Sequence, residues 1–65
     1  MTLKKNRLKE YRERLGFSQE MLAKKVNVSR QTIISIETAR YVPSLELSLK
    51  FAALFQCKVE NLFGI

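Results

Sequence analysis

The stretch QEMLAKKVNVSRQTIISIET, residues 19–38, decides how this chain folds. Its first half carries Leu22, Ala23 and Val26, which are spaced so that they share one face of a helix. Asn27 then stands where a helix commonly ends, and asparagine tolerates the left-handed backbone conformation that such an ending uses. These features predict a short helix followed by a tight turn.

A second short helix is expected after that turn. Ser29 is a good N-cap for it, as Ser18 is for the first helix, because a serine hydroxyl accepts a hydrogen bond from a free N–H of the first turn. Ile33 and Ile36 are spaced to form its inward face. Ala23 carries no bulk beyond its Cβ atom, so we expect the two helices to cross closely beside it. Two helices that cross through a short turn have the layout of a helix-turn-helix.

The outward face of the second helix is polar near its start. It holds Arg30, Gln31, Thr32 and Ser35. Side chains of these types suit the base edges and phosphates of nucleic acids. The competing interpretation is an exposed helix face that is merely solvated, and on residue type alone that interpretation is the more common one.

The net charge of the chain favours a polyanionic partner. Lys and Arg total 12 against 6 acidic residues, which gives a net charge of +6. The excess is confined to residues 1–42, which hold ten basic and four acidic side chains, whereas residues 43–65 hold two of each. Such an asymmetry predicts attraction to nucleic acid, although a basic surface that only confers solubility has the same composition.

Length and missing residue types narrow the function classes. The 65 residues form one small domain, which buries only about 60% of the surface that its unfolded chain exposes. The chain has no His and no Asp, and Cys57 is its one cysteine, so catalytic triads, intrachain disulfides and most zinc sites are excluded. No apolar run approaches the roughly 20 residues that span a bilayer. We therefore expect a cytoplasmic protein with no membrane contact, enzyme activity, metal, cofactor or evident small-molecule ligand.

The segment before the central stretch predicts another helix, over residues 7–15. Asn6 is placed to cap it, and Gly16 ends it. Arg12 is charged but lies on the apolar side of this helix, so it either extends outward to solvent or has a fixed partner. Residues 2–5 either lengthen the helix or run extended beside the last residues of the chain as a minor terminal strand.

The segment after the central stretch predicts a loop over residues 39–43 and then a helix capped by Ser44. This helix carries two apolar stripes: Leu45, Leu49, Ala52 and Phe55 form one, and Leu47, Phe51 and Leu54 form the other. Two stripes exceed what a core of this size needs, so one of them is a candidate subunit interface. Cys57 is expected to be a small buried hydrophobic residue, and one last helical turn is expected at residues 59–63.

The segment SQEMLAKKVNVSRQTIISIE, followed by YVPSLELSLKFAALF, resembles the Cro/phage-repressor type of helix-turn-helix regulator. The likeness is strongest to small stand-alone members, such as the cytolysin-operon repressor, and it runs from about Asn6 to Phe63. It implies an all-α, lambda-repressor-like bundle of about five short helices that spans residues 1–65. It also implies a transcriptional repressor that inserts its third helix into the major groove of double-stranded DNA.

Site residues follow from the resemblance by position. Base contacts fall on Arg30, Gln31 and Ser35. Residue chemistry adds Thr32, which suits a thymine methyl group or a phosphate, and Ile34, which suits thymine methyl groups. Phosphate contacts fall on Gln19, Ser29, Thr38, Arg40 and Tyr41. Matching positions in the family also form a structural ion pair, which here would join Arg12 to Glu37.

The resemblance further implies a homodimer on a two-fold symmetric operator. The small size of the chain and the neutrality of residues 43–65 favour contact between two copies through the C-terminal end. We place Leu54, Asn61, Phe63 and Ile65 in this dimer interface, and Leu62 in the core of one subunit.

The alternative function is an antitoxin-type or other protein-interaction module of a two-gene system. Domains of the Cro type also occur in such pairs, and DNA binding can coexist with that role. RNA binding is less favoured, because the sequence shows no pattern of exposed aromatic residues on which bases could stack.

Overall fold

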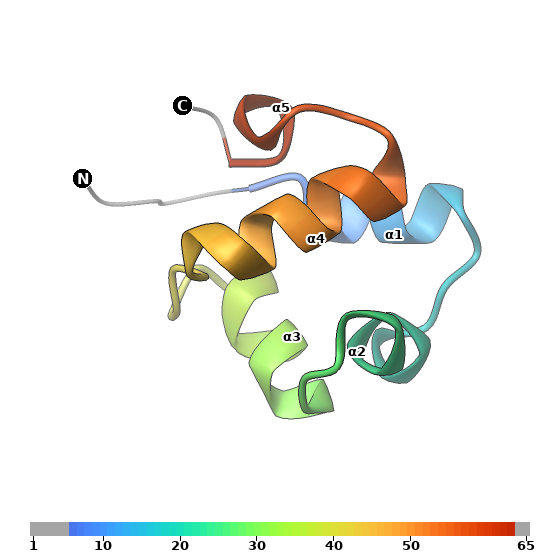
Figure 1. Ribbon diagram of the computed structural model, residues 1–65. Helices are drawn as coiled ribbons and strands as arrows, with labels where there is room; N and C mark the ends of the chain where they lie inside the picture. Colours follow the sequence, from blue (N-terminus) through green and yellow to red (C-terminus); the bar gives the residue numbers. More distant parts are fainter. Residues whose placement is uncertain (1–5, 64–65) are drawn as a thin grey trace.

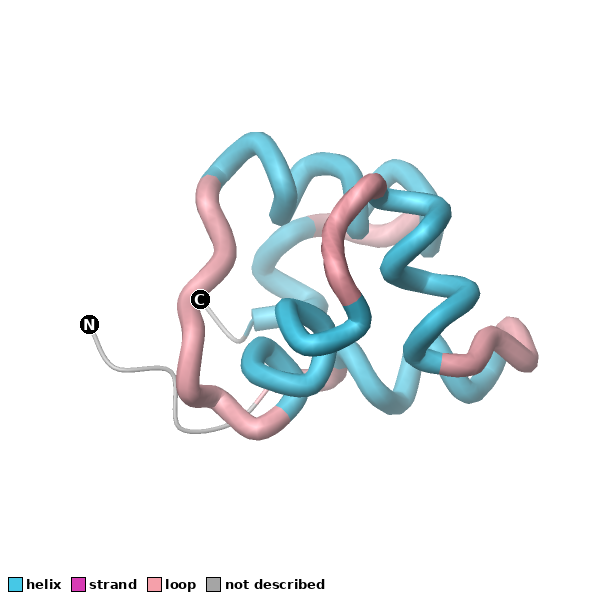
Figure 2. Tube along the Cα trace, turned by 90° about the horizontal axis from the view of Figure 1, so that it is seen from below, coloured by secondary structure: helices cyan, strands magenta, loops and turns pink. Residues whose placement is uncertain are grey.

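The computed structural model describes residues 6–63, and this part of the chain folds into five helices without a strand (Figure 2). The bounds are α1 Leu8–Arg14, α2 Gln19–Val26, α3 Arg30–Glu37, α4 Leu45–Phe55 and α5 Val59–Phe63. The all-α prediction is therefore confirmed, and the two helices of the central stretch lie where the sequence places them. The minor strand predicted from residues 2–5 lies outside the described residues.

The helices form two groups around α4 (Figure 1). α2 and α3 lie on one side of α4, where they pack against each other, and α5 lies on the other side. α1 contacts both α3 and α5, so it connects the two groups. The amide of Arg7 just before α1 donates a hydrogen bond of 2.8 Å to the carbonyl of Leu62 in α5, which fastens the start of the fold to its last helix.

Serine side chains start three of the helices. Ser18, Ser29 and Ser44 each occupy an N-cap position with extended backbone, and their hydroxyl oxygens accept the amides of Met21, Thr32 and Leu47 at 3.0, 3.1 and 3.2 Å. Each of these bonds satisfies one amide that the helix itself leaves free. The three predicted serine caps are confirmed.

The structure also confirms the predicted ends of α1 and α2. Gly16 has φ +73° after α1, and Asn27 has φ +60° at the end of α2. Two further residues with a side chain, Ala39 and Gln56, adopt the same left-handed region with φ +60° and +53°. Sequence reasoning does not find these two, because neither residue type favours that region.

The start of α1 differs from the prediction. The helix spans Leu8–Arg14 rather than residues 7–15, and Arg7 occupies its N-cap position. Asn6 still caps it from one residue farther out, because its Oδ1 accepts the amide of Leu8 at 3.0 Å. The Nδ2 of Asn6 donates to the carbonyl of Ile36 at 2.7 Å, so the same side chain ties α1 to the end of α3.

The core collects the apolar faces of all five helices. Its fully buried residues are Leu8, Leu22, Ile33, Ile36, Phe51 and Leu62. Leu62 lies in the core as predicted.

The two predicted stripes of α4 are redistributed, which corrects the sequence-based grouping. Leu47, Phe51 and Phe55 face the core at four-residue spacing, whereas Leu45 and Leu49 are 71% and 53% exposed. Two positions along a helix correspond to about 200° of rotation, so Leu45 and Leu49 lie on the side away from Leu47 and Phe51.

Candidate nucleic-acid interface

The inner face of α3 holds the helix in a fixed orientation. Ile33 and Ile36 are 0% exposed, and they pack in the same core cluster as Leu22 and Ala23 of α2. A helix anchored by two fully buried isoleucines cannot rotate about its axis without exposing them. The opposite face of α3 is thereby held toward solvent.

Several predicted contact residues in α3 and in the loop after it are exposed to solvent. Arg30 and Gln31 are exposed in the first turn of α3, and Arg40 is exposed in the loop after it. Ile34 is half-buried. The structure thus exposes a guanidinium and an amide group in the first turn of α3, and groups of these types suit base edges.

A shallow hollow of about 270 Å³ lies on the same surface. Its lining consists of Ser29, Gln31, Thr32, Ser35 and Tyr41. The hollow brings together three predicted base-contact residues of α3 and two predicted phosphate-contact residues. Tyr41, which comes from the loop beyond α3, reaches this surface although it lies ten residues after Gln31.

The hydroxyl groups at the two ends of α3 have partners within the protein. The Ser29 and Thr32 hydroxyl oxygens lie 2.9 Å apart. The Thr38 hydroxyl donates to the carbonyl of Ile34 at 2.8 Å, so its only proton is engaged in its own helix. A phosphate accepts hydrogen bonds, and Thr38 would have to give up this bond to donate one.

Arg12 and Glu37 form an ion pair between α1 and the last residue of α3. The Nε atom of Arg12 lies 2.7 Å from Oε2 of Glu37, and the two side chains are only 10% and 5% exposed. Nη1 of Arg12 donates to the carbonyl of Phe17 at 2.8 Å, and Nη2 donates to Oε1 of Glu37 at 3.3 Å. The structure therefore contains the ion pair that the family resemblance implies.

Gln19 stands at the start of α2 and joins this network. Its Nε2 atom donates to Oε1 of Glu37 at 3.2 Å, and its side chain is half-buried. The sequence predicts that Gln19 contacts a phosphate, but it does not predict this bond to Glu37. The sequence does show that Glu37 lies on the inward side of α3 and that Gln19 is polar at the first position of α2. Nothing in the sequence indicates that these two residues contact each other.

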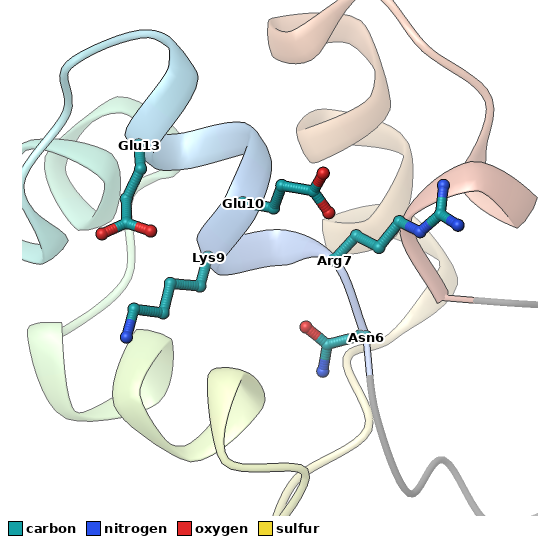
Figure 3. A pocket seen from close by; sticks show the side chains of 5 residues that line it. All are labelled: Asn6, Arg7, Lys9, Glu10 and Glu13. Carbon is teal, nitrogen blue, oxygen red and sulfur yellow. The ribbon is translucent and has the colours of Figure 1, made fainter.

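A second, wider hollow of about 660 Å³ lies beside α1 (Figure 3). It is lined by Asn6, Arg7, Lys9, Glu10 and Glu13. Glu10 is already paired with Arg14 at 2.7 Å, whereas Lys9 and Glu13, which are also four residues apart, form no ion pair within residues 6–63. The lining contains two basic and two acidic side chains, so this surface does not favour a ligand of one charge.

The predicted dimer-interface residues have different environments. Asn61 is exposed and Leu54 is half-buried. Phe63 is only 3% exposed because it packs in the core of its own subunit, which corrects its placement at an interface. Ile65 lies outside the described residues.

Two further properties concern the described part of the chain. None of its helices is both long and apolar enough to cross a membrane. Residues 6–63 contain no group of three His, Cys, Asp or Glu side chains placed to hold a metal ion.

Comparison with known proteins agrees with the geometry of α2 and α3. A family model described as helix-turn-helix matches residues 8–62, which is most of the chain. The chain belongs to the helix-turn-helix family of transcriptional regulators and is a DNA-binding regulator rather than an enzyme.

Similar proteins occur in archaea and bacteria, and the matches cover most of their length. An uncharacterized HTH-type transcriptional regulator of Methanocaldococcus jannaschii is 54% identical over 91% of this chain and 89% of its own length. An uncharacterized HTH-type transcriptional regulator of Bacillus subtilis, YgzD, is 51% identical over 94% of this chain and 92% of its own length. These names favour the regulator over the antitoxin-type alternative.

Proposed function

We propose that this protein is a sequence-specific transcriptional repressor that inserts α3 into the major groove of double-stranded DNA. The observation that carries the proposal is the exposure of Arg30 and Gln31 in the first turn of a helix that Ile33 and Ile36, both fully buried, hold in the core. An arginine matches O6 and N7 of guanine, and a glutamine matches N6 and N7 of adenine. Ser35, Thr32 and Ile34 would complete the base contacts.

Contacts with the DNA backbone would surround the recognition helix. Gln19 and Ser29 lie near the N-termini of α2 and α3, where free amides favour a phosphate. Arg40 and Tyr41 would hold the backbone from the loop after α3, with Thr38 joining them if its hydroxyl leaves Ile34. The excess of basic residues within residues 1–42 supports this arrangement, because that part of the chain carries both α2 and α3.

The regulator would act as a homodimer on a two-fold symmetric operator, at the nucleoid in the cytoplasm. Two recognition helices reach successive major grooves on one side of B-DNA when they lie about 34 Å apart. Leu54 and Asn61 remain candidates for the interface, together with Ile65. The equal numbers of acidic and basic residues in 43–65 support contact there, since two subunits would meet without like-charge repulsion.

The test is a competition between a duplex enriched by in vitro selection and a random duplex of equal length. We expect the selected duplex to bind at least about a thousandfold more tightly at physiological salt. Its log affinity should fall with log salt concentration by about 0.9 for each phosphate neutralised. Equal binding of the two duplexes would refute the proposed sequence specificity.

A further inference from the structure

The carboxylate of Glu37 accepts hydrogen bonds from two different helices. Arg12 of α1 donates through Nε at 2.7 Å and through Nη2 at 3.3 Å. Gln19 of α2 donates through Nε2 at 3.2 Å to the same Oε1 atom that accepts Nη2. Glu37 is itself the last residue of α3, so this single carboxylate joins α1, α2 and α3.

This arrangement determines which way the amide group of Gln19 faces. An ionised carboxylate only accepts hydrogen bonds, so Gln19 must turn its NH₂ group toward Glu37 and its oxygen away. Turning the amide over would place two oxygens against each other. Glu37 cannot move to relieve that contact, because its side chain is 5% exposed and paired with Arg12.

We propose that Glu37 is a positioning residue for DNA binding, and that it holds the Gln19 amide ready to donate to a phosphate. One N–H of the amide is engaged by Glu37, and the second N–H remains available for a phosphate oxygen beside the start of α2. Arg12 neutralises the carboxylate, so Glu37 does not repel the phosphate. This inference rests on the proposed function of the protein as a DNA-binding regulator.

Glu37 is expected to increase DNA affinity by holding the Gln19 side chain in its binding conformation before DNA arrives. A free glutamine side chain loses rotamer freedom when it binds, and this loss weakens association by a factor of about two to ten. A glutamine already held by Glu37 avoids most of that loss. Glu37 should therefore increase DNA affinity through Gln19, in addition to any effect on folding stability.

The experiment is a double-mutant cycle in DNA affinity. The dissociation constant of the selected duplex is measured for wild type, Gln19→Ala, Glu37→Gln and the double variant, at a temperature where circular dichroism shows each protein folded. We expect Glu37→Gln to weaken binding about two- to tenfold in the wild-type background. In the Gln19→Ala background it should weaken binding less than about twofold, because the side chain it positions is already gone.

Asn6→Ala supplies the matched control. Asn6 bonds to the carbonyl of Ile36, so its loss disturbs the same end of α3 without touching Gln19. Its effect on affinity should be the same in both backgrounds. If Glu37→Gln weakens DNA binding equally with and without Gln19, the positioning role is overturned. If the wild type binds the selected and the random duplex equally well, the proposed function is overturned instead.

A measurement on the wild-type protein keeps the inference testable if Glu37→Gln does not fold. Nuclear magnetic resonance should show one Gln19 side-chain amide proton protected from exchange in the free protein, and the second protected after the selected duplex is added. Rapid exchange of both protons in the free protein would overturn the proposal.

Discussion

Nε of Arg12 lies 2.7 Å from Oε2 of Glu37, and this contact joins α1 to the end of α3. Both side chains are at least nine-tenths buried. The guanidinium also donates to the carbonyl of Phe17, so its remaining donors are satisfied in part by the chain between α1 and α2. Because Arg12 is itself fixed by its bond to Phe17, its pair with Glu37 sets the orientation of α3 as well as its position.

Removing one member of this pair should be costly, because it leaves the other charge buried without its partner. We expect Arg12→Met or Glu37→Gln to lower the free energy of unfolding by about 3–5 kcal/mol. The double variant should be less destabilised than the sum of the two. Urea titration of the four proteins measures the coupling, and a coupling energy near zero would contradict a buried pair. Glu10→Gln serves as the control, because its pair with Arg14 is exposed.

The left-handed conformation of Gln56 at the end of α4 predicts a stabilising substitution. Its φ of +53° is strained for a residue with a Cβ atom, by about 1–2 kcal/mol. Glycine removes the strain but loses about 0.5–1 kcal/mol more backbone entropy on folding. Gln56→Gly should therefore stabilise the protein by up to about 1 kcal/mol in thermal unfolding.

Ala53→Gly is the matched control for this effect, because Ala53 is exposed in the interior of the same helix. It should destabilise the protein by about 1 kcal/mol. If Gln56→Gly destabilises the protein as Ala53→Gly does, the backbone strain at Gln56 is not significant.

The Cys57 thiol should react slowly in the folded protein. Burial raises the pKa of this thiol, and a hydrogen bond with Tyr11 only partly offsets the increase. As the pH rises, the unfolded chain therefore loses its thiol proton before the folded chain does, and the stability contributed by the neutral thiol is lost. Alkylation by iodoacetamide near pH 8 should be slower in buffer than in denaturant. Ala53→Cys in a Cys57→Ser background gives the exposed control, and equal rates for the two cysteines would contradict the shift.

If the proposed homodimer forms, the protein should sediment with twice the mass of one chain. Two lysine substitutions in the proposed interface should prevent this association. Sedimentation equilibrium should show a dimer at tens of micromolar, or on a duplex that carries two half-sites. Leu54→Lys combined with Asn61→Lys should favour the monomer, because four like charges would then face each other across the two-fold axis. Ala53→Lys with Gln56→Lys adds the same charge at exposed positions outside the proposed interface. A wild-type monomer on the two-half-site duplex would contradict the arrangement.

Local sequence signals predicted the helix-turn-helix well, because its determinants lie close together in the chain. Ser18 and Ser29 cap the two helices as expected, and Asn27 makes the left-handed turn between them. A cap or a turn depends on residues within four positions of one another, so one sequence contains the whole signal.

Longer-range features were predicted less well. Whether Leu45 or Leu47 faces the core depends on where α4 lies against α2 and α5, which spacing within α4 alone does not determine. Phe63 is equally apolar whether it packs inside its own subunit or against another, so its burial could not be predicted. The bond between Gln19 and Glu37 joins residues 18 positions apart, and no local pattern connects them.

The central claim is that α3 reads bases while Gln19 holds the backbone, and base preference in two variants tests it most directly. Binding of a library of single-base variants of the selected duplex is measured for wild type, Gln31→Ala and Gln19→Ala. Gln31→Ala should lose about 1–3 kcal/mol and relax the preference at particular base pairs, because its amide would no longer contact a base edge. Gln19→Ala should weaken every duplex about equally and leave the preference unchanged. Unchanged affinity and unchanged base preference in Gln31→Ala would contradict the docking of α3 in the major groove.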